Sequence, residues 1–247
     1  MRALCEKYDF ALGEQLSTML RASGVLPIDV SCRVDRYNRL SVEIEAAKEE
    51  AAALFKKDLL RQIDRVCGRK MDAPCISTAP DRCRIQFSEK PAFQAELAIA
   101  QHVCNNGSLC GDHCTYFNDG LGRMVMIVSD GMGSGEPARK ESALTCRLLR
   151  QFLEAGIEPE AALKTLNAAM ALRGAETGSF TTIDLCAFQP STGEAAFYKF
   201  GAAPSYLKKG GTVRRVTGGS LPAGLRGTPA SPDVTTVRLE PGSFAVM

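Results

Sequence analysis

The sequence predicts an α+β fold in which a small α+β domain precedes a larger antiparallel β-sandwich flanked by helices. In the first third of the chain, apolar residues recur at helical and then at strand spacing, and this order is repeated. The last third reads as one strand after another, separated by short turns. Parallel strands need long crossovers, so this close spacing indicates antiparallel pairing.

The N-terminal domain is expected over residues 1–88, in the order helix, hairpin, helix, hairpin. Asp9 is a candidate N-cap for the first helix, which is expected to end at Gly24. The other elements expected here are strands at 28–34 and 40–44, a helix at 46–67, and short strands around 76 and at 83–87.

The C-terminal domain is expected over residues 89–247, after a joint at 88–91. Two consecutive amphipathic helices are predicted at 137–153 and 158–172, the second with Pro159 at its first position, where proline is favoured. Strands are expected at 93–99, 114–116, 123–128, 181–188, 194–200, 205–208, 212–216 and 235–239, with another beginning at 244.

Composition excludes some classes of function. The 30 basic and 28 acidic residues are interspersed, so no basic stripe suggests a nucleic-acid partner. No run approaches the roughly 20 apolar residues that cross a bilayer, and we expect a cytoplasmic domain. The ten cysteines form no CxxC pair, which favours reduced thiols. One cluster could hold zinc but matches no closed ligand pattern: His102, Cys104, Cys110, His113 and Cys114.

The most informative stretch is residues 124–135, an apolar strand that leads through Asp130 and Gly131 to a helix start. One interpretation is a glycine loop that binds a dinucleotide phosphate at the helix N-terminus. The motif is incomplete, because Glu136 stands where the last glycine is needed. The antiparallel hairpins predicted downstream also disagree with a βαβ unit.

The other interpretation makes Asp130 a metal ligand beside Gly131, which lets a cation approach the backbone carbonyl. Asp112 begins the preceding strand, and in an antiparallel pair the start of one strand lies beside the end of the other. The two carboxylates are therefore expected to converge, an arrangement that suits hard cations such as Mg²⁺ or Mn²⁺. The alternative is that both aspartates merely cap turns.

Several short motifs, in unbroken order from about residue 90 to 247, resemble the stage II sporulation protein E family, a branch of the PPM (type 2C) phosphatases. The region before them resembles that family's regulatory region by pattern more than by motif. The motifs are Gly111-Asp112, Val128 to Ala138, Ser179 to Leu185, Lys199 to Ser205, and Ser220 to Gly224.

The resemblance implies a PPM-type sandwich with two Mn²⁺ or Mg²⁺ ions. Asp130 corresponds to the aspartate that bridges both ions, Asp112 to the acidic ligand of the first motif, and Gly131 to a carbonyl ligand. We expect Thr182 and Asp184, with the adjacent Thr181, beside these ligands. His113 is a further candidate there, with a plain surface histidine as the alternative.

The resemblance also implies a substrate and a partner, the phosphoserine form of an anti-anti-sigma factor with a STAS domain, acting during sporulation. A homodimer is left open, as is a parent protein anchored in a membrane by segments outside this chain. The alternatives are another PPM phosphatase of a stress-signalling pathway and a catalytically silent binding module.

Two further expectations follow from the resemblance. The family's strand after residue 244 ends in a second Asp-Gly that holds a metal, and a further metal aspartate follows it. Neither is in this sequence, so we expect an incompletely liganded centre and weak or no activity. The helices at 137–153 and 158–172 are expected to be a movable unit that couples the N-terminal domain to the metal site.

Overall fold

The computed structural model describes residues 7–35, 37–50, 57–103, 109–119, 121–177, 180–225 and 231–247. The chain forms two compact units, Met1–Ala92 and Phe93–Met247. Within the described ranges, no helix combines the length and apolar character that crossing a membrane requires.

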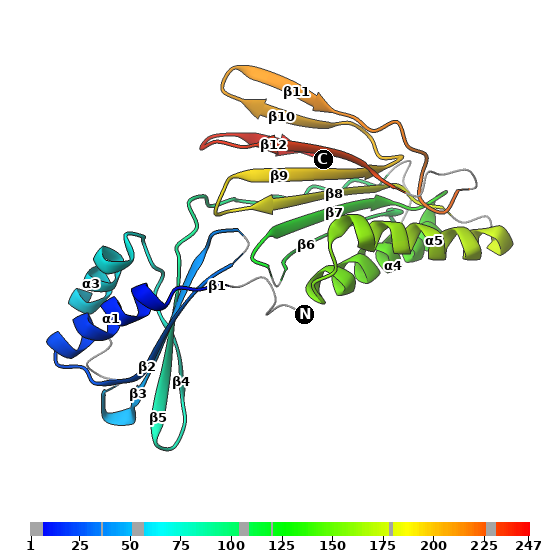
Figure 1. The fold of residues 1–247 in the computed structure, drawn as a ribbon. Helices are drawn as coiled ribbons and strands as arrows, with labels where there is room; N and C mark the ends of the chain where they lie inside the picture. The colour runs from blue at the N-terminus through cyan, green and yellow to red at the C-terminus, as the bar shows by residue number, and fades with distance from the viewer. Residues whose placement is uncertain are drawn as a thin grey trace. The chain divides into compact units, whose positions relative to one another are not determined.

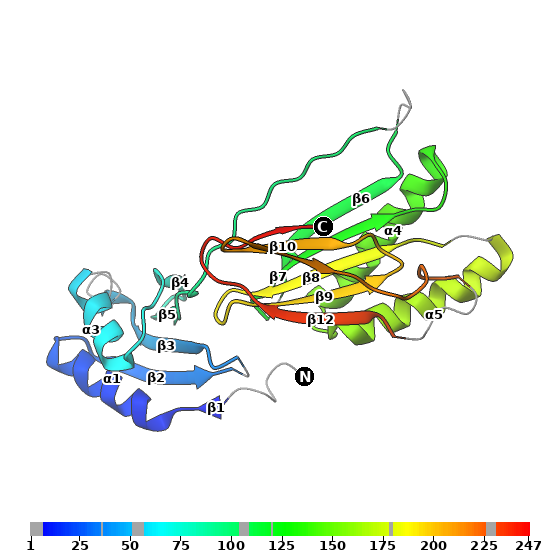
Figure 2. The ribbon, with the colours of Figure 1, turned by 90° about the horizontal axis from the view of Figure 1, so that it is seen from above.

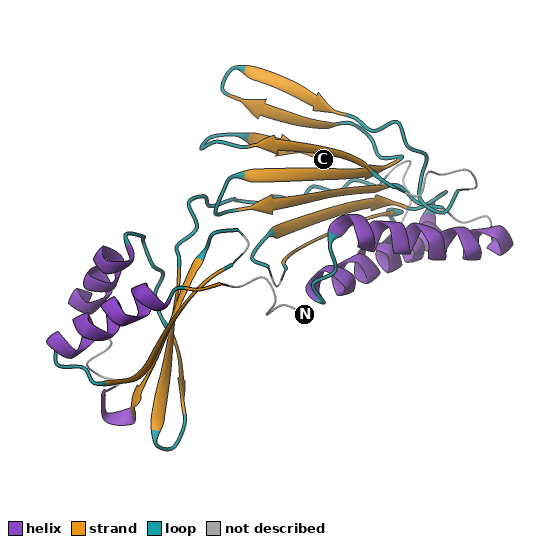
Figure 3. Cartoon of the chain, viewed as in Figure 1, coloured by secondary structure: helices purple, strands orange, loops and turns teal. Residues whose placement is uncertain are grey.

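The first unit is one antiparallel sheet with two helices on one face (Figures 1 and 3). Strand order is β1-β2-β3-β5-β4. Leu16 and Leu20 of the first helix and Ile63 of the second are fully buried against the sheet. The elements are β1 Lys7–Tyr8, α1 Phe10–Ala22, β2 Pro27–Val34, β3 Leu40–Ala47, a 3₁₀ turn Lys48–Glu50, α3 Lys57–Cys67, β4 Cys75–Thr78 and β5 Arg82–Ser88.

Local signals account for most of this unit. Asp9 caps α1, its carboxylate accepting a hydrogen bond from the Leu12 amide at 3.0 Å. The helix predicted from residue 46 begins later, because Ala46 continues the buried alternation of β3 and pairs with Cys83 of β5. Residues 51–56 lie outside the described ranges, and the described helix begins at Lys57.

The second unit has three layers. A helix pair covers one face of a five-stranded antiparallel sheet ordered β12-β9-β8-β7-β6, and a three-stranded sheet ordered β11-β10-β13 packs on its other face (Figures 1 and 2). The elements are β6 Asp112–Asn118, β7 Met124–Asp130, α4 Gly135–Glu154, α5 Pro159–Thr177, β8 Ile183–Gln189, β9 Glu194–Phe200, β10 Ser205–Lys209, β11 Thr212–Val216, β12 Asp233–Arg238 and β13 Phe244–Val246.

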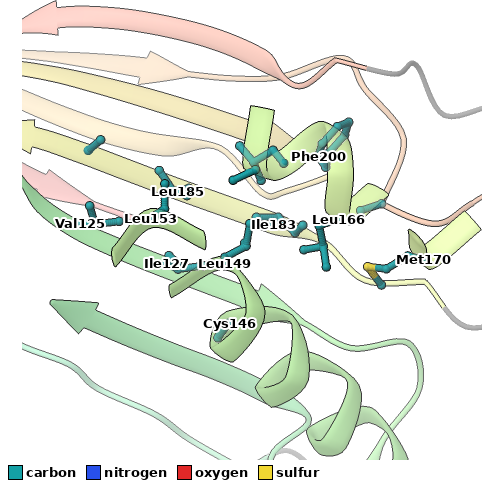
Figure 4. Close-up of a cluster of buried hydrophobic side chains, with 14 of the residues drawn as sticks. Val125, Ile127, Cys146, Leu149, Leu153, Leu166, Met170, Ile183, Leu185 and Phe200 are labelled. Carbon is teal, nitrogen blue, oxygen red and sulfur yellow. The ribbon is translucent and has the colours of Figure 1, made fainter. Parts of the chain in front are cut away.

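Two apolar cores hold these layers together. Val125, Ile127 and Leu185 point toward α4 and α5, where Leu149 and Leu153 meet them (Figure 4). On the other face, Phe188 and Phe197 pack against Leu207 and Val216 of the smaller sheet, and Cys186 and Ala195 are also buried in this second core. The central strand β8 is buried along its whole length, as expected for a strand covered on both faces.

The strand predicted at 93–99 is absent. Phe93 packs edge-on against Phe188, with ring centroids 6.4 Å apart, and its amide donates to the carbonyl of Pro190. Most of the residues after it are exposed. The alternation of apolar residues was present, but a strand also needs a neighbour along its hydrogen-bonding edge.

Candidate metal centre

Asp112 and Asp130 lie directly opposite each other at the open end of the β6–β7 hairpin. Residues opposed in this way send their side chains to the same face, with Cβ atoms roughly 5 Å apart. The tight turn at 118–123 sets this register, since Asn118 pairs with Met124. The structure thus brings together the two carboxylates that the sequence pointed to.

The proximity of these carboxylates affects their protonation. Burial, a hydrogen bond that the protonated Asp130 donates to Asp112, and the charge of Asp112 together raise the pKa of Asp130 to about 6. Two carboxyl groups this close favour a shared proton or a cation between them. The donor set is all oxygen, which fits Mg²⁺ or Mn²⁺, since these ions keep several waters and need few protein carboxylates.

Gly131 is held against the first turn of α4. A Cβ built on Gly131 would lie 2.1 Å from the carbonyl oxygen of Ala138, so no larger residue fits without moving the helix. The Gly131 carbonyl oxygen is 3.9 Å from a Cβ built on Gly111, the residue before Asp112. The third predicted ligand therefore also lies near this end of the hairpin.

The threonine pair before β8 holds the backbone of Asp130. The Thr181 hydroxyl lies 2.6 Å from the Asp130 carbonyl oxygen and 2.8 Å from the Ser129 hydroxyl. The Thr182 amide also donates to the Asp130 carbonyl, at 2.9 Å, and the Asp130 amide donates to the Thr182 hydroxyl at 3.2 Å. Both threonines thus fix the backbone of Asp130.

Two further residues fix the strand that carries Asp112, and sequence reasoning missed both. The Ser142 hydroxyl of α4 donates to the Gly111 carbonyl at 2.6 Å, and the Gln101 side-chain amide donates to the Asp112 carbonyl at 2.9 Å. Ser142 is fully buried. A polar residue on the buried face of an amphipathic helix is the one signal that could have singled it out.

His113 and Asp184 do not contact the carboxylate pair. Successive strand residues face opposite ways, so His113 lies on the α4 side of the sheet, where its carbonyl contacts the Cys146 thiol. Asp184 is buried and bound to Lys199, with 2.5 Å between its Oδ2 and the lysine Nζ. It lies on the same face as Asp130 but one pleat away, because its partner on β7 is Val128.

Of the alternatives considered for this region, the glycine loop is contradicted, whereas the zinc cluster falls partly outside the described residues. Strands β7 and β8 are antiparallel neighbours, so the glycine loop does not belong to a βαβ unit. Cys104 of the cysteine–histidine cluster lies outside the described residues. Within the described part of the chain, no three His, Cys, Asp or Glu side chains gather closely enough to hold a metal. Asp112 and Asp130 therefore stand as a pair.

Comparison with known proteins gives this geometry a context. The sequence model of the family described as Stage II sporulation protein E (SpoIIE) matches residues 120–247, just over half of the chain. The chain belongs to this family.

Two relatives in the SpoIIE family extend the comparison. The stage II sporulation protein E of Priestia megaterium is 31% identical over 151 residues, covering 61% of this chain and 26% of its own length. That of Bacillus subtilis is 29% identical over 163 residues, covering 66% and 20%. The chain thus spans about a quarter or less of these relatives.

A solved structure shows that the fold is shared. The PP2C phosphatase domain of Bacillus subtilis SpoIIE, with a fragment of its regulatory domain, superposes with a TM-score of 0.64 at 23% identity. The match covers 95% of this chain and 68% of that one. The mixture of helices and antiparallel sheets predicted from the sequence is therefore the PP2C-type fold.

Proposed function

We propose that this chain carries the catalytic domain of a metal-dependent protein serine/threonine phosphatase of the SpoIIE type. The observation that carries the proposal is the pairing of Asp112 with Asp130, next to Gly131, where a larger residue would clash with Ala138. Membership of the SpoIIE family and the PP2C-type fold support it. The proposed active site is therefore the open end of the β6–β7 hairpin.

In this proposal, the carboxylates of Asp130 and Asp112 and the backbone carbonyl of Gly131 would hold Mn²⁺ or Mg²⁺. Such ions, when bound, lower the pKa of a coordinated water and neutralise charge on the phosphoryl oxygens. The chain's own part is positional: Thr181 and Thr182 fix the Asp130 backbone, while Ser142 and Gln101 fix the strand that bears Asp112.

The proposed substrate is the phosphoserine form of a STAS-domain anti-anti-sigma factor, with the first unit as a regulatory domain. Support comes from family membership. Because the described residues offer a carboxylate pair without a third close acidic or histidine ligand, we expect weak metal binding and slow turnover. A stress-pathway PPM phosphatase and a silent binding module are the competing functions.

The test is release of phosphate from a phosphoserine-bearing STAS protein, with and without Mn²⁺. The rates of the unchanged chain and of Asp130→Asn are compared. Asp81→Asn is the control, because it also removes one carboxylate but at an exposed position in the first unit. We expect Mn²⁺-dependent release that Asp130→Asn abolishes and Asp81→Asn leaves intact. Equal rates in all three proteins would overturn the catalytic assignment. Binding of the phosphoprotein without any release would favour the binding module.

A further inference from the structure

A charged group with no role in the proposal above lies in the interior of the sandwich. The side chain of Lys199 on β9 is 1% exposed and that of Asp184 on β8 is 7% exposed. The lysine Nζ lies 2.5 Å from Asp184 Oδ2, 2.7 Å from the Ser205 hydroxyl and 2.8 Å from the Ala203 carbonyl oxygen. All three N–H bonds of the ammonium group therefore have acceptors.

The two carboxylate oxygens of Asp184 differ in their hydrogen bonds. Its Oδ2 accepts from both Lys199 and the Ser205 hydroxyl, the latter at 2.6 Å. Its Oδ1 is buried, and within the described residues no group donates a hydrogen bond to it. A buried carboxylate oxygen without a donor is costly, and interiors usually resolve such a cost with an ordered water.

Strand register places Asp184 one row away from the candidate metal centre, on the same face of the sheet. Asp112 and Asp130 share one row of the inter-sheet face, and Thr182, hydrogen-bonded to Asp130, lies just before β8. The adjacent row holds Val128, Asp184 and Lys199. Asp184 and Asp130 are therefore diagonal neighbours on adjacent strands, with Cβ atoms about 7–8 Å apart, which leaves room for one water between their side chains.

We infer that Asp184 is a positioning residue that holds, through Oδ1, an ordered water of the metal centre, and that Lys199 fixes the orientation of Asp184. The inference rests on the proposed function. Lys199 leaves one carboxylate oxygen for the water by engaging the other. Carboxylates that orient the ligands of a metal in this way commonly change metal affinity 10- to 100-fold when removed, about the effect we expect here.

A purely structural ion pair is the alternative, and the two are separable. Replacing a buried ion pair by apolar residues of similar size often leaves a protein folded, whereas removing one partner strands the other charge. The informative variant is therefore the double substitution Asp184→Leu/Lys199→Met. Asp184→Asn is the conservative companion, because it keeps the shape of the side chain and loses the charge.

A matched control exists in the same domain. Asp119 and Arg123 form another buried ion pair, 2.7 Å between Asp119 Oδ2 and Arg123 Nε, at the turn end of the β6–β7 hairpin. That end is roughly 20 Å from the Asp112–Asp130 pair, given the rise per strand residue. Asp119→Asn disturbs a buried charge equally, without touching the candidate centre.

The experiment measures Mn²⁺ affinity by electron paramagnetic resonance in the full chain, with metal-free thermal unfolding as the check of folding. The expected result is a fall of about 10- to 100-fold for the double variant and for Asp184→Asn, with none for Asp119→Asn. A folded double variant with unchanged affinity overturns the inference and leaves the proposed function standing. If the unchanged chain binds no Mn²⁺, the proposed function fails, and this inference with it.

A crystal structure of the unchanged chain with Mn²⁺ decides the matter if the double variant does not fold. A water within hydrogen-bonding distance of Asp184 Oδ1 and of a metal ligand supports the inference. A protein donor on Oδ1 in place of that water contradicts it.

Discussion

Asp112 and Asp130 pair across the open end of one hairpin, and the carboxyl group of Asp112 helps to raise the pKa of Asp130. The opposite end of the same hairpin is fixed by the buried Asp119–Arg123 ion pair. At one end of the hairpin an acid is thus paired with a base, while at the other end two acids lie opposite each other. This asymmetry is what a cation-binding end requires.

The metal-free chain should lose stability as pH rises through the titration of Asp130. Burial and Asp112 raise the pKa of Asp130 to about 6, above the ordinary value of about 3.9. The folded chain therefore holds a proton that the unfolded chain releases, so the contribution of Asp130 to stability is greatest below about pH 4 and declines up to about pH 6. Partial exposure of Asp130 screens the effect. Urea denaturation across this pH range measures it.

Asp130→Asn provides the control for that dependence. Without metal, we expect the variant to be more stable than the unchanged chain at neutral pH and to lose the decline between about pH 4 and 6. With Mn²⁺ the order should reverse, because only the unchanged chain gains binding energy. A decline of equal size in both proteins would show that another group is responsible.

Gly131→Ala should destabilise the second unit. The new Cβ meets the Ala138 carbonyl oxygen at 2.1 Å, and backbone cannot yield as a side chain can. We expect a loss of about 1–3 kcal/mol or more in the free energy of unfolding, with α4 displaced. Gly211→Ala is the control, because nothing lies within 4 Å of its Cβ. Similar unfolding midpoints for the two variants would contradict this packing argument.

Thr181→Val should loosen the Asp130 backbone while keeping the shape of the side chain. The change removes the hydrogen bond to the Asp130 carbonyl and leaves the buried Ser129 hydroxyl without that partner. The expected cost is about 1–3 kcal/mol, together with weaker Mn²⁺ binding. Thr181→Ser, which keeps the hydroxyl, should retain most of the affinity. Calorimetry on both variants tests this, and equal Mn²⁺ affinities would argue against a role for the hydroxyl.

The sequence predicted the Asp112–Asp130 convergence because the cause is local. A short turn fixes the register of two adjacent strands, so strand ends can be paired from sequence alone. The same locality explains the success with Asp9, whose capping bond spans three residues. Where the contacts join residues that are close in the sequence, the residue pattern was enough to predict the local structure.

The predictions failed where a distant segment decides the outcome. Residues 93–99 alternate like a strand but pair with no sheet edge, whereas Ala46 looks helical but lies in β3, paired with β2 on one side and β5 on the other. The buried Lys199 was not anticipated either. Its partner Asp184 is supplied by the register of β8 with β9, and its third acceptor by the chain entering β10. A lysine in an apolar run carries no sign of which carboxylate it meets.

A hydrogen-bonded path leads from α5 to the candidate centre. The Asn167 side-chain oxygen accepts from the Gly224 amide at 2.9 Å. The neighbouring Ala223 exchanges two backbone hydrogen bonds with Thr181, whose hydroxyl contacts the Asp130 carbonyl. Asn167 is almost fully buried, so its amide group is in place to transmit a shift of α5. This path gives physical content to the expectation that the helix pair communicates with the metal site.

Asn167→Leu should therefore speed hydrogen exchange at the amides of Thr181, Ala223 and Gly224, because the Gly224 amide loses its acceptor in a buried place. The expected cost is about 1–3 kcal/mol in the local opening energy. Thr165→Ala is the control on the same helix, since the Thr165 hydroxyl donates to the Ala161 carbonyl within α5. Mass spectrometry of peptides spanning 180–225 reads the exchange. If Asn167→Leu and Thr165→Ala exchange alike there, α5 does not act on Asp130 through this segment, and a switch in the helix pair would have to work through the Gly131–Ala138 contact instead.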